Sequence, residues 1–173
     1  MKTIKLSCAH ALFKFLIAQK TIIDGKKVPL FPGAFAIYGH GNVACLGQAM
    51  EEFQSDLPGY RGHHEQSMAL SGIGYARAMR RKQIFIATSS SGPGAMNMVT
   101  AAGVALSNRL PLLLLPGDVF ASRFPDPVLQ QVENFNSPVE NQNDAFKPVS
   151  RFFDRITRPE QILNSLPQAI QIM

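Results

Sequence analysis

The chain has 173 residues, of which 46% are hydrophobic and 17% charged. This balance excludes an intrinsically disordered protein and is typical of one globular domain with a sizeable core. The formal net charge is +5, but the basic residues are scattered. Their densest run, residues 77–82 (RAMRRK), falls where a helix is expected to end. Cations at that position offset the helix dipole, so no nucleic-acid partner is expected.

The two cysteines, Cys8 and Cys45, have a spacing that fits neither a disulfide framework nor a metal site. We expect both to be small core residues of a protein from a reducing compartment, which favours the cytoplasm. The first 16 residues begin with a basic residue, but Lys14 interrupts their apolar run, which argues against a signal peptide. Residues 110–115 are too few to span a membrane, so no membrane partner is expected.

Short apolar strands alternate with helices along most of the chain. Apolar periodicity predicts a first helix over residues 6–20, followed by a turn at Asp24-Gly25. The later expected strands cover residues 34–39, 59–64 (a weak one), 83–90 and 111–117, and the later helices cover 42–53, a segment that opens near Glu65, and 93–108. This alternation predicts an α/β fold, an open parallel sheet flanked by helices on both faces, in a single domain over residues 1–173.

The C-terminal third differs in composition. Residues 118–149 are rich in proline, asparagine and aspartate with little periodicity, so we expect a functional or interface loop there. Thr157 and Glu160 fit a capping box that starts a last helix. In an α/β domain another strand normally follows such a helix, so the chain is expected to be truncated at its C-terminus.

Three segments are expected at the carboxyl ends of strands, where open α/β sheets bind ligands. They are residues 39–42 (GHGN), the corner at Glu65, and residues 89–97 (SSSGPGAMN). The glycines allow close approach of the backbone to a ligand, but they could equally be turn residues. The serines could serve only as helix caps, and Glu65 as a first-turn acid beside the helix dipole. If Glu65 is buried, a ligand could instead be its partner.

The chain has four histidines that could be ligands or proton carriers. His63 and His64 are adjacent, so on a strand they would point to opposite faces and could not chelate a metal. His10 is expected to be an ordinary helix residue. His40, between two glycines at a strand end, has the best case for a functional role, and no metal site is expected in this chain.

A rival interpretation uses the same residues. Gly39-x-Gly41-x-x-Ala44 follows a buried strand, and Glu65 comes about 20 residues later, which outlines the nicotinamide-dinucleotide fingerprint of an oxidoreductase. This interpretation requires Glu65 to be exposed at a strand tip and leaves SSSGPG without a task. The P-loop pattern GxxxxGK[ST] does not occur, which argues against a nucleotide triphosphatase.

Four segments together resemble the pyrimidine-binding domain of thiamine-diphosphate-dependent enzymes of the acetolactate synthase-like superfamily. They are HEQSMALSGIGYAR, SSSGPGAMN, LPLLLLPGDV and NDAFKPVSR. Over nearly all of its length the chain is most similar to a member that hydrolytically opens a cyclic 1,2-dione during inositol breakdown. The alternative within the superfamily is acetolactate synthase-like carboligase or decarboxylase chemistry. Lys147 stands where the acetolactate synthases carry glutamine, which favours the hydrolase.

The resemblance also implies roles for individual residues. Glu65 would meet the N1′ nitrogen of the cofactor's aminopyrimidine and, held in an apolar pocket, would share a proton with it. Protonation of N1′ favours deprotonation of the reacting carbon of the thiazolium ring. His40 would handle substrate protons. The other positions that match the lining of the pyrimidine pocket or the loop beside the reacting carbon are Gly41, Asn42, Ser90, Pro93 and Asn97.

Parts of the family's site have no counterpart in this sequence. The family holds Mg²⁺ and the diphosphate through a G-D-G…N-N motif in a separate domain, which Pro116-Gly117-Asp118 resembles only in part. The resemblance therefore implies an N-terminal pyrimidine-binding domain without its diphosphate-binding and central domains, inactive alone. The implied cofactors are thiamine diphosphate and Mg²⁺ held through the absent domain. The implied partners are a cyclic dione and the diphosphate-binding domain of a second subunit in a homodimer or homotetramer.

Overall fold

A four-stranded parallel sheet forms the centre of the protein in the computed structural model, which describes residues 3–121, 129–132, 134, 136–137 and 140–173. Its strands follow the order β4-β3-β5-β6, and each neighbouring pair is parallel. The strands are β3 (Ala34–Ala36), β4 (Gly59–Arg61), β5 (Ile86–Ser89) and β6 (Leu113–Pro116). The expected α/β class and parallel sheet are confirmed.

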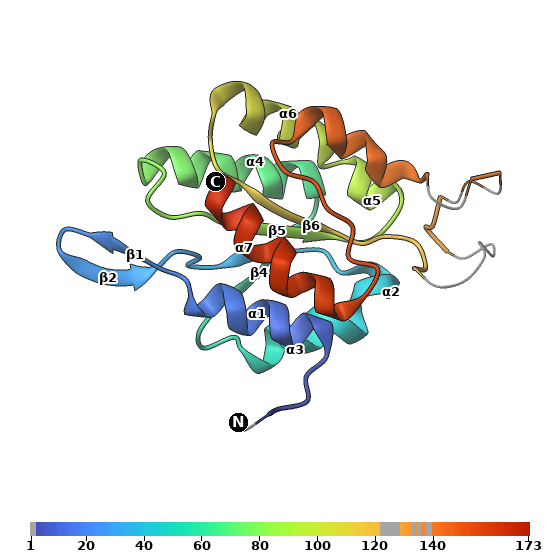
Figure 1. Cartoon of the computed structure of the whole chain (residues 1–173). Coiled ribbons are helices and arrows are strands. Elements are labelled where there is room, and N and C mark those ends of the chain that lie inside the picture. The colour runs from blue at the N-terminus through green and yellow to red at the C-terminus, as the bar shows by residue number, and fades with distance from the viewer. Residues whose placement is uncertain (1–2, 122–128, 133, 135, 138–139) are drawn as a thin grey trace.

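Helices cover both faces of this sheet, as Figure 1 shows. The helical segments are α1 (Cys8–Ala18), α2 (Gly39–Asn42), the π-helical η1 (Val43–Gly47), α3 (Gln48–Glu52), α4 (Glu65–Ala78), α5 (Pro93–Met96), α6 (Val99–Asn108), the 3₁₀ helices η2 (Gln142–Val149) and η3 (Pro159–Gln161), and α7 (Ile162–Ile172). Helices α1, α3 and α7 lie on one face, and α4, α5 and α6 on the other. The sheet is therefore the middle of three layers.

The core divides into two clusters, one on each face of the sheet. Ile86 packs in the cluster under α1, whereas its neighbour Ala87 packs in the cluster under α4 and α6. Successive side chains of a strand point to opposite faces, so one strand serves both clusters. All four residues of β5 are buried, and the apolar run at residues 84–87 (IFIA), which leads into this strand and begins it, makes the segment recognisable in the sequence.

A β-hairpin at residues 20–29 was not foreseen. Strands β1 (Lys20–Ile23) and β2 (Lys26–Pro29) pair antiparallel across Asp24 and Gly25. Both turn residues have positive φ, 50° and 77°, as a two-residue hairpin turn requires. The turn was correctly predicted, but the strands carry lysines and bury no residue fully, so no hydrophobic signal marks them.

Several element boundaries differ from the expectations. The helix expected over residues 42–53 begins at Gly39 and contains the π-helical turn η1. The helix expected over 93–108 is interrupted, since α5 ends at Met96 and α6 begins at Val99. Within the expected loop over 118–149, residues 142–149 form η2, while residues 122–128, 133, 135 and 138–139 lie outside the described part of the chain.

Two residue-level expectations are wrong. The capping partner of Thr157 is Gln161 and not Glu160, because the Gln161 Oε1 atom accepts hydrogen bonds from the Thr157 amide at 2.7 Å and the Thr157 hydroxyl at 2.8 Å. Cys45 is exposed and Cys8 only half-buried, so neither is a full core residue. Among the described residues, no helix is both long and apolar enough to cross a membrane.

Candidate functional site

The strand order reverses between β3 and β5, and we call the corner at the carboxyl ends of these two strands the crevice. From β3 the chain moves to β4 on one side of it, and then returns to place β5 on the other side. In open parallel sheets, ligands bind at the carboxyl ends of strands where the order reverses in this way. The segments that leave the two strands here are GHGN (residues 39–42) and SSSG (residues 89–92). Two of the three corners predicted from the sequence therefore lie at the carboxyl ends of the adjacent strands β3 and β5.

Direct contacts hold the ends of β3, β5 and β6 together. The Asn42 side-chain amide donates a hydrogen bond to the Ser89 carbonyl at 2.7 Å, and the Gly117 amide donates to the same carbonyl at 3.1 Å. A Cβ atom on Gly117 would lie 2.7 Å from the Ser91 backbone nitrogen and 3.0 Å from Asn42 Nδ2. Only glycine fits at 117 without displacing this corner.

Gly39 is the second glycine that the corner requires. Its φ is +54°, and a Cβ atom there would overlap the side chain of Ser90. The Ser90 hydroxyl in turn donates a hydrogen bond to Gln130 Oε1 at 2.9 Å. The first glycine of GHGN is thus explained by backbone conformation and by packing on the serine turn.

Glu65 is the first residue of α4, directly after the N-cap residue His64, whose Nδ1 accepts from the Ser67 amide at 3.4 Å. The Glu65 carboxylate points to the turn after β5, where its Oε2 atom accepts a hydrogen bond from Asn97 Nδ2 at 2.9 Å. A Cβ atom on Gly94 would lie 3.1 Å from Oε1. In the described part of the chain, Oε1 has no hydrogen-bond partner of its own.

The break between α5 and α6 explains how Asn97 reaches Glu65. Asn97 is the C-cap residue that follows α5, and α6 starts two residues later, at Val99. The structure thus brings Glu65, Asn97, Ser90 and Asn42 to the same edge of the sheet.

The remaining predicted positions are more exposed. His40 and Gly41 are exposed on α2, and Pro93 is the exposed first residue of α5. Within the described part of the chain, no hydrogen bond or ion pair joins the His40 side chain to the other predicted residues. Glu65 is half-buried, so the expectation that it is withheld from water within this chain is wrong. The cause is its place at the rim of the domain, beside the exposed Asn97.

The geometry does not match the dinucleotide interpretation. That interpretation needs Glu65 at the tip of β4, but β4 ends at Arg61 and Glu65 lies inside α4. It also leaves SSSGPG without a role, whereas this segment carries Ser89, the partner of Asn42, and leads into Asn97, the partner of Glu65. Of the other histidines, His10 has an exposed partner, since its Nε2 lies 2.9 Å from Glu52 Oε2.

The sequence did not single out Ser91. Four consecutive hydroxyl residues end β5 and begin the turn, and each is at most 3% exposed. The hydroxyls of Thr88, Ser89 and Ser90 have partners in Leu115 O, Ser90 O and Gln130 Oε1. The Ser91 hydroxyl has none among the described residues. A run of identical residues gives no signal that could distinguish Ser91 from Ser90, the residue that was predicted.

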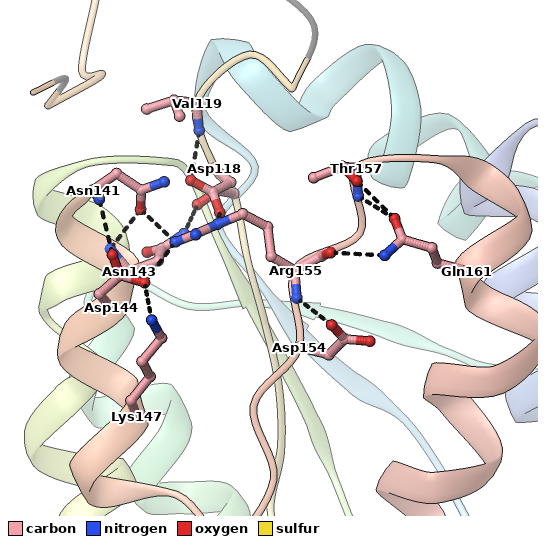
Figure 2. Close-up of polar contacts among 11 residues, drawn as sticks. Asp118, Val119, Asn141, Asn143, Asp144, Lys147, Asp154, Arg155, Thr157 and Gln161 are labelled. Carbon is pink, nitrogen blue, oxygen red and sulfur yellow. Dashed lines mark hydrogen bonds and ion pairs between the residues drawn. The ribbon is translucent and has the colours of Figure 1, made fainter. Parts of the chain in front are cut away.

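An ion-pair network anchors the end of β6 to η2, as Figure 2 shows. Arg155 Nε lies 2.9 Å from Asp118 Oδ2, and Arg155 Nη2 lies 3.0 Å from both Asn141 Oδ1 and Asp144 Oδ1. Next to it, the side-chain amide of the buried Asn143 donates to the Gly117 carbonyl at 2.8 Å. The network and Asn143 therefore hold the β6 corner against η2.

The network changes the acid–base properties of its members. Burial alone would raise the pKa of Asp144, but hydrogen bonds from the Asn141 amide, Lys147 and Arg155, and the Arg155 charge, lower that pKa below its ordinary value. Burial likewise opposes the charge on Arg155, yet Asp118 and Asp144 raise the pKa of its guanidinium. Both groups are thus stabilised in their charged forms.

We expect the Asp144→Asn variant to lose about 1–2 kcal/mol of stability at pH 7, because it loses charge-assisted hydrogen bonds. The pKa of Asp144 is lower in the folded state than in the unfolded state. The stabilisation by its carboxylate is therefore complete at a pH above the unfolded-state pKa of about 3.9, and it is lost as the pH falls through the lower folded-state pKa. Denaturant unfolding of parent and variant at pH 7, 5 and 3 should show a difference in the free energy of unfolding that becomes smaller at pH 3. A gap of constant size would contradict this account.

Lys147, the residue that departs from the acetolactate synthases, has local partners. Its ammonium lies 3.0 Å from Asp144 Oδ1 and 5.7 Å from the centre of the Phe153 ring. The side chain is 57% exposed. It belongs to the surface of η2 and the Arg155 network.

A thiamine-type cofactor is compatible with the residues at the crevice. The free Oε1 atom of Glu65 can meet a ring nitrogen, and the lack of a side chain on Gly94 leaves room beside that atom. The described residues contain no group of three His, Cys, Asp or Glu side chains that could hold a metal ion.

Comparisons with known proteins agree with this geometry. The family model "Thiamine pyrophosphate enzyme, N-terminal TPP binding domain" matches residues 33–137. The 3D-(3,5/4)-trihydroxycyclohexane-1,2-dione hydrolases of Bacillus velezensis and Shouchella clausii are 51% and 52% identical to the chain over 172 residues, and that of Clostridium tetani is 51% identical over 173. These matches cover 99–100% of this chain but 27% of each relative, so the chain spans about a quarter of their length.

Proposed function

Because the chain belongs to the thiamine pyrophosphate enzyme family through its N-terminal TPP-binding domain, we propose that it is the pyrimidine-binding part of a longer enzyme. The reaction we propose is the hydrolytic ring opening of 3D-(3,5/4)-trihydroxycyclohexane-1,2-dione in inositol breakdown. The support is sequence identity of about half along almost the whole chain to relatives that bear this name. The structural observation that carries it is the Glu65–Asn97 pair beside Gly94.

Glu65 is the residue to which we assign the proton chemistry. Its Oε2 atom is fixed by the Asn97 amide, so Oε1 is left to share a proton with the pyrimidine nitrogen of the cofactor. When bound, thiamine diphosphate supplies a nucleophilic carbon and an electron sink for breaking a bond between two carbonyl carbons. Asn97 keeps the carboxyl group in one orientation, so the proton is presented in a fixed direction.

The other residues of the crevice shape and orient the site. Asn42 ties the GHGN loop to β5, which keeps Gly41 and His40 beside the crevice. Pro93 begins the helix that carries Asn97, and the Ser90 hydroxyl holds Gln130 against the turn. His40 is exposed at the mouth of this corner, where a substrate proton could reach it. We assign to it the transfer of substrate protons.

The half-buried state of Glu65 bears on the partners. A carboxyl group that shares a proton works best when shielded from water, and this chain shields Glu65 on one side only. We propose that the diphosphate-binding domain of a second subunit supplies the other side, in a homodimer or homotetramer, and holds Mg²⁺. The two unpaired cysteines agree with a cytoplasmic location.

Turnover measurements on the enzyme that carries this chain test the proposal. With thiamine diphosphate and Mg²⁺, we expect hydrolysis of the cyclic dione and little or no acetolactate from pyruvate. Omission of the cofactor should abolish the reaction. Acetolactate formation at a comparable rate would favour the carboligase alternative, and a reaction that depends only on a nicotinamide cofactor would refute the proposal.

A further inference from the structure

Ser91 carries a buried hydroxyl that the fold does not use. The residue is 3% exposed, and its Oγ atom has no hydrogen-bond partner in the part of the chain that the structure describes. Its three predecessors, Thr88 to Ser90, are buried to the same degree and all have partners. A buried polar group without a partner destabilises the fold, so such groups in native proteins are few and call for an explanation.

The surroundings of Ser91 place this hydroxyl at the crevice. On its backbone side, Ser91 packs against Gly117 at the end of β6. On its side-chain side, Oγ faces Gly41 of the GHGN loop: a Cβ atom built on Gly41 would lie 3.9 Å from it and would meet no other described atom within 4 Å outside its own helix. Gly41 itself is exposed. The hydroxyl therefore lies at the corner between the ends of β3 and β5, opposite a residue that has no side chain.

The chemistry of a serine hydroxyl suits a particular kind of ligand. It can donate one hydrogen bond and accept others, so it can serve a carbonyl oxygen as well as a hydroxyl group. A six-membered ring that carries adjacent carbonyls and several hydroxyls offers both kinds of group. A buried serine hydroxyl in a binding site also discriminates against analogues that cannot hydrogen-bond to it, because the hydroxyl is then left without a partner.

We propose that Ser91 is a specificity-determining residue that hydrogen-bonds to an oxygen atom of the polyhydroxylated cyclic dione. This inference rests on the proposed function, since it names the residue that recognises the proposed substrate. It differs from the assignments to Glu65, Ser90 and Asn97, which concern the cofactor. Ser91 acts on the substrate from the floor of the crevice, opposite the GHGN loop.

The Ser91→Ala variant of the enzyme that carries this chain tests the proposal, with Thr88→Val as a matched control. Both substitutions remove one buried hydroxyl from the same strand end, but the Thr88 hydroxyl already bonds to the Leu115 carbonyl at 2.7 Å. For Ser91→Ala we expect kcat/KM for the cyclic dione to fall about 5- to 10-fold through a higher KM, as for the loss of one hydrogen bond. Its melting temperature should be unchanged or raised. Thr88→Val should show the opposite pattern, a lower melting temperature with an unchanged KM.

A third measurement separates substrate from cofactor. The rise in melting temperature on addition of thiamine diphosphate and Mg²⁺ should be the same for Ser91→Ala and the parent. An unchanged KM for the dione, or a weakened response to the cofactor without an effect on KM, would overturn the proposal. If the parent enzyme does not hydrolyse the dione, the proposed function fails; if it does and Ser91→Ala matches it, the role of Ser91 alone fails.

Discussion

Replacing Glu65 with glutamine is expected to lower the turnover of the enzyme by about 10²–10⁴-fold, the usual contribution of a positioned acid or base. Glutamine has the same shape, and its carbonyl oxygen can still accept the hydrogen bond from Asn97 Nδ2. The amide cannot, however, take up or release a proton at the position of Oε1. The loss should therefore appear in kcat, with the fold and the binding of substrate largely retained.

The control for this variant is Glu52→Gln, which makes the same chemical change at an exposed glutamate that pairs with His10 on α1. It should retain the turnover of the parent. Circular dichroism and the melting temperature should show that both variants are folded. Turnover by Glu65→Gln within a few-fold of the parent would contradict the assignment of the proton to this residue.

Replacing Gly117 with alanine is expected to destabilise the protein by about 1–3 kcal/mol, the usual cost of forcing an extra methyl group into a packed site. The new Cβ atom would lie 2.7 Å from the backbone nitrogen of Ser91. A flexible side chain could rotate away from such a contact, but a backbone atom at a strand end cannot. The ends of β5 and β6 would have to separate, so we also expect a loss of activity.

Gly74→Ala is the matched control for Gly117→Ala. Gly74 lies inside α4, and a Cβ atom there would meet nothing within 4 Å among the described residues. Because alanine favours the helix over glycine, this variant should gain up to about 1 kcal/mol. Urea unfolding of both variants measures the two effects, and activity should fall only in Gly117→Ala. Equal stability of the two variants would show that the β6 corner can adapt.

The hydrophobic pattern was sufficient to predict the central strands and their neighbours. Strand β5 is buried on both faces, and its first two residues belong to the apolar run at residues 84–87 (IFIA) that marks it in the sequence. The hairpin over residues 20–29 and the 3₁₀ helix η2 were missed for the opposite reason. Their residues are largely exposed or polar, and η2 is held by Asn143 and the Arg155 network rather than by apolar periodicity.

The candidate site was predictable only to the level of segments. The position of Glu65 at a strand-to-helix corner was expected from the sequence, but its partner Asn97 acquires its orientation from the break between α5 and α6. Likewise, the sequence pointed to the serine turn as a whole. Some hydroxyls of this turn bond within the fold, and one is left for a ligand. This division depends on contacts with Gln130 and Leu115, which lie far away along the chain.

The order of the strands also governs when the crevice can exist during synthesis. Strands β3 and β4 leave the ribosome first, yet the Asn42 side chain finds its acceptor only 47 residues further along, at Ser89. A nascent chain that stops before β5 can close one α/β unit but has no second wall for the crevice. Non-local pairings of this kind form late in folding. If the coenzyme binds at the proposed site, an incompletely translated domain is therefore expected not to bind it until β5 has crossed back to the side of β3 away from β4.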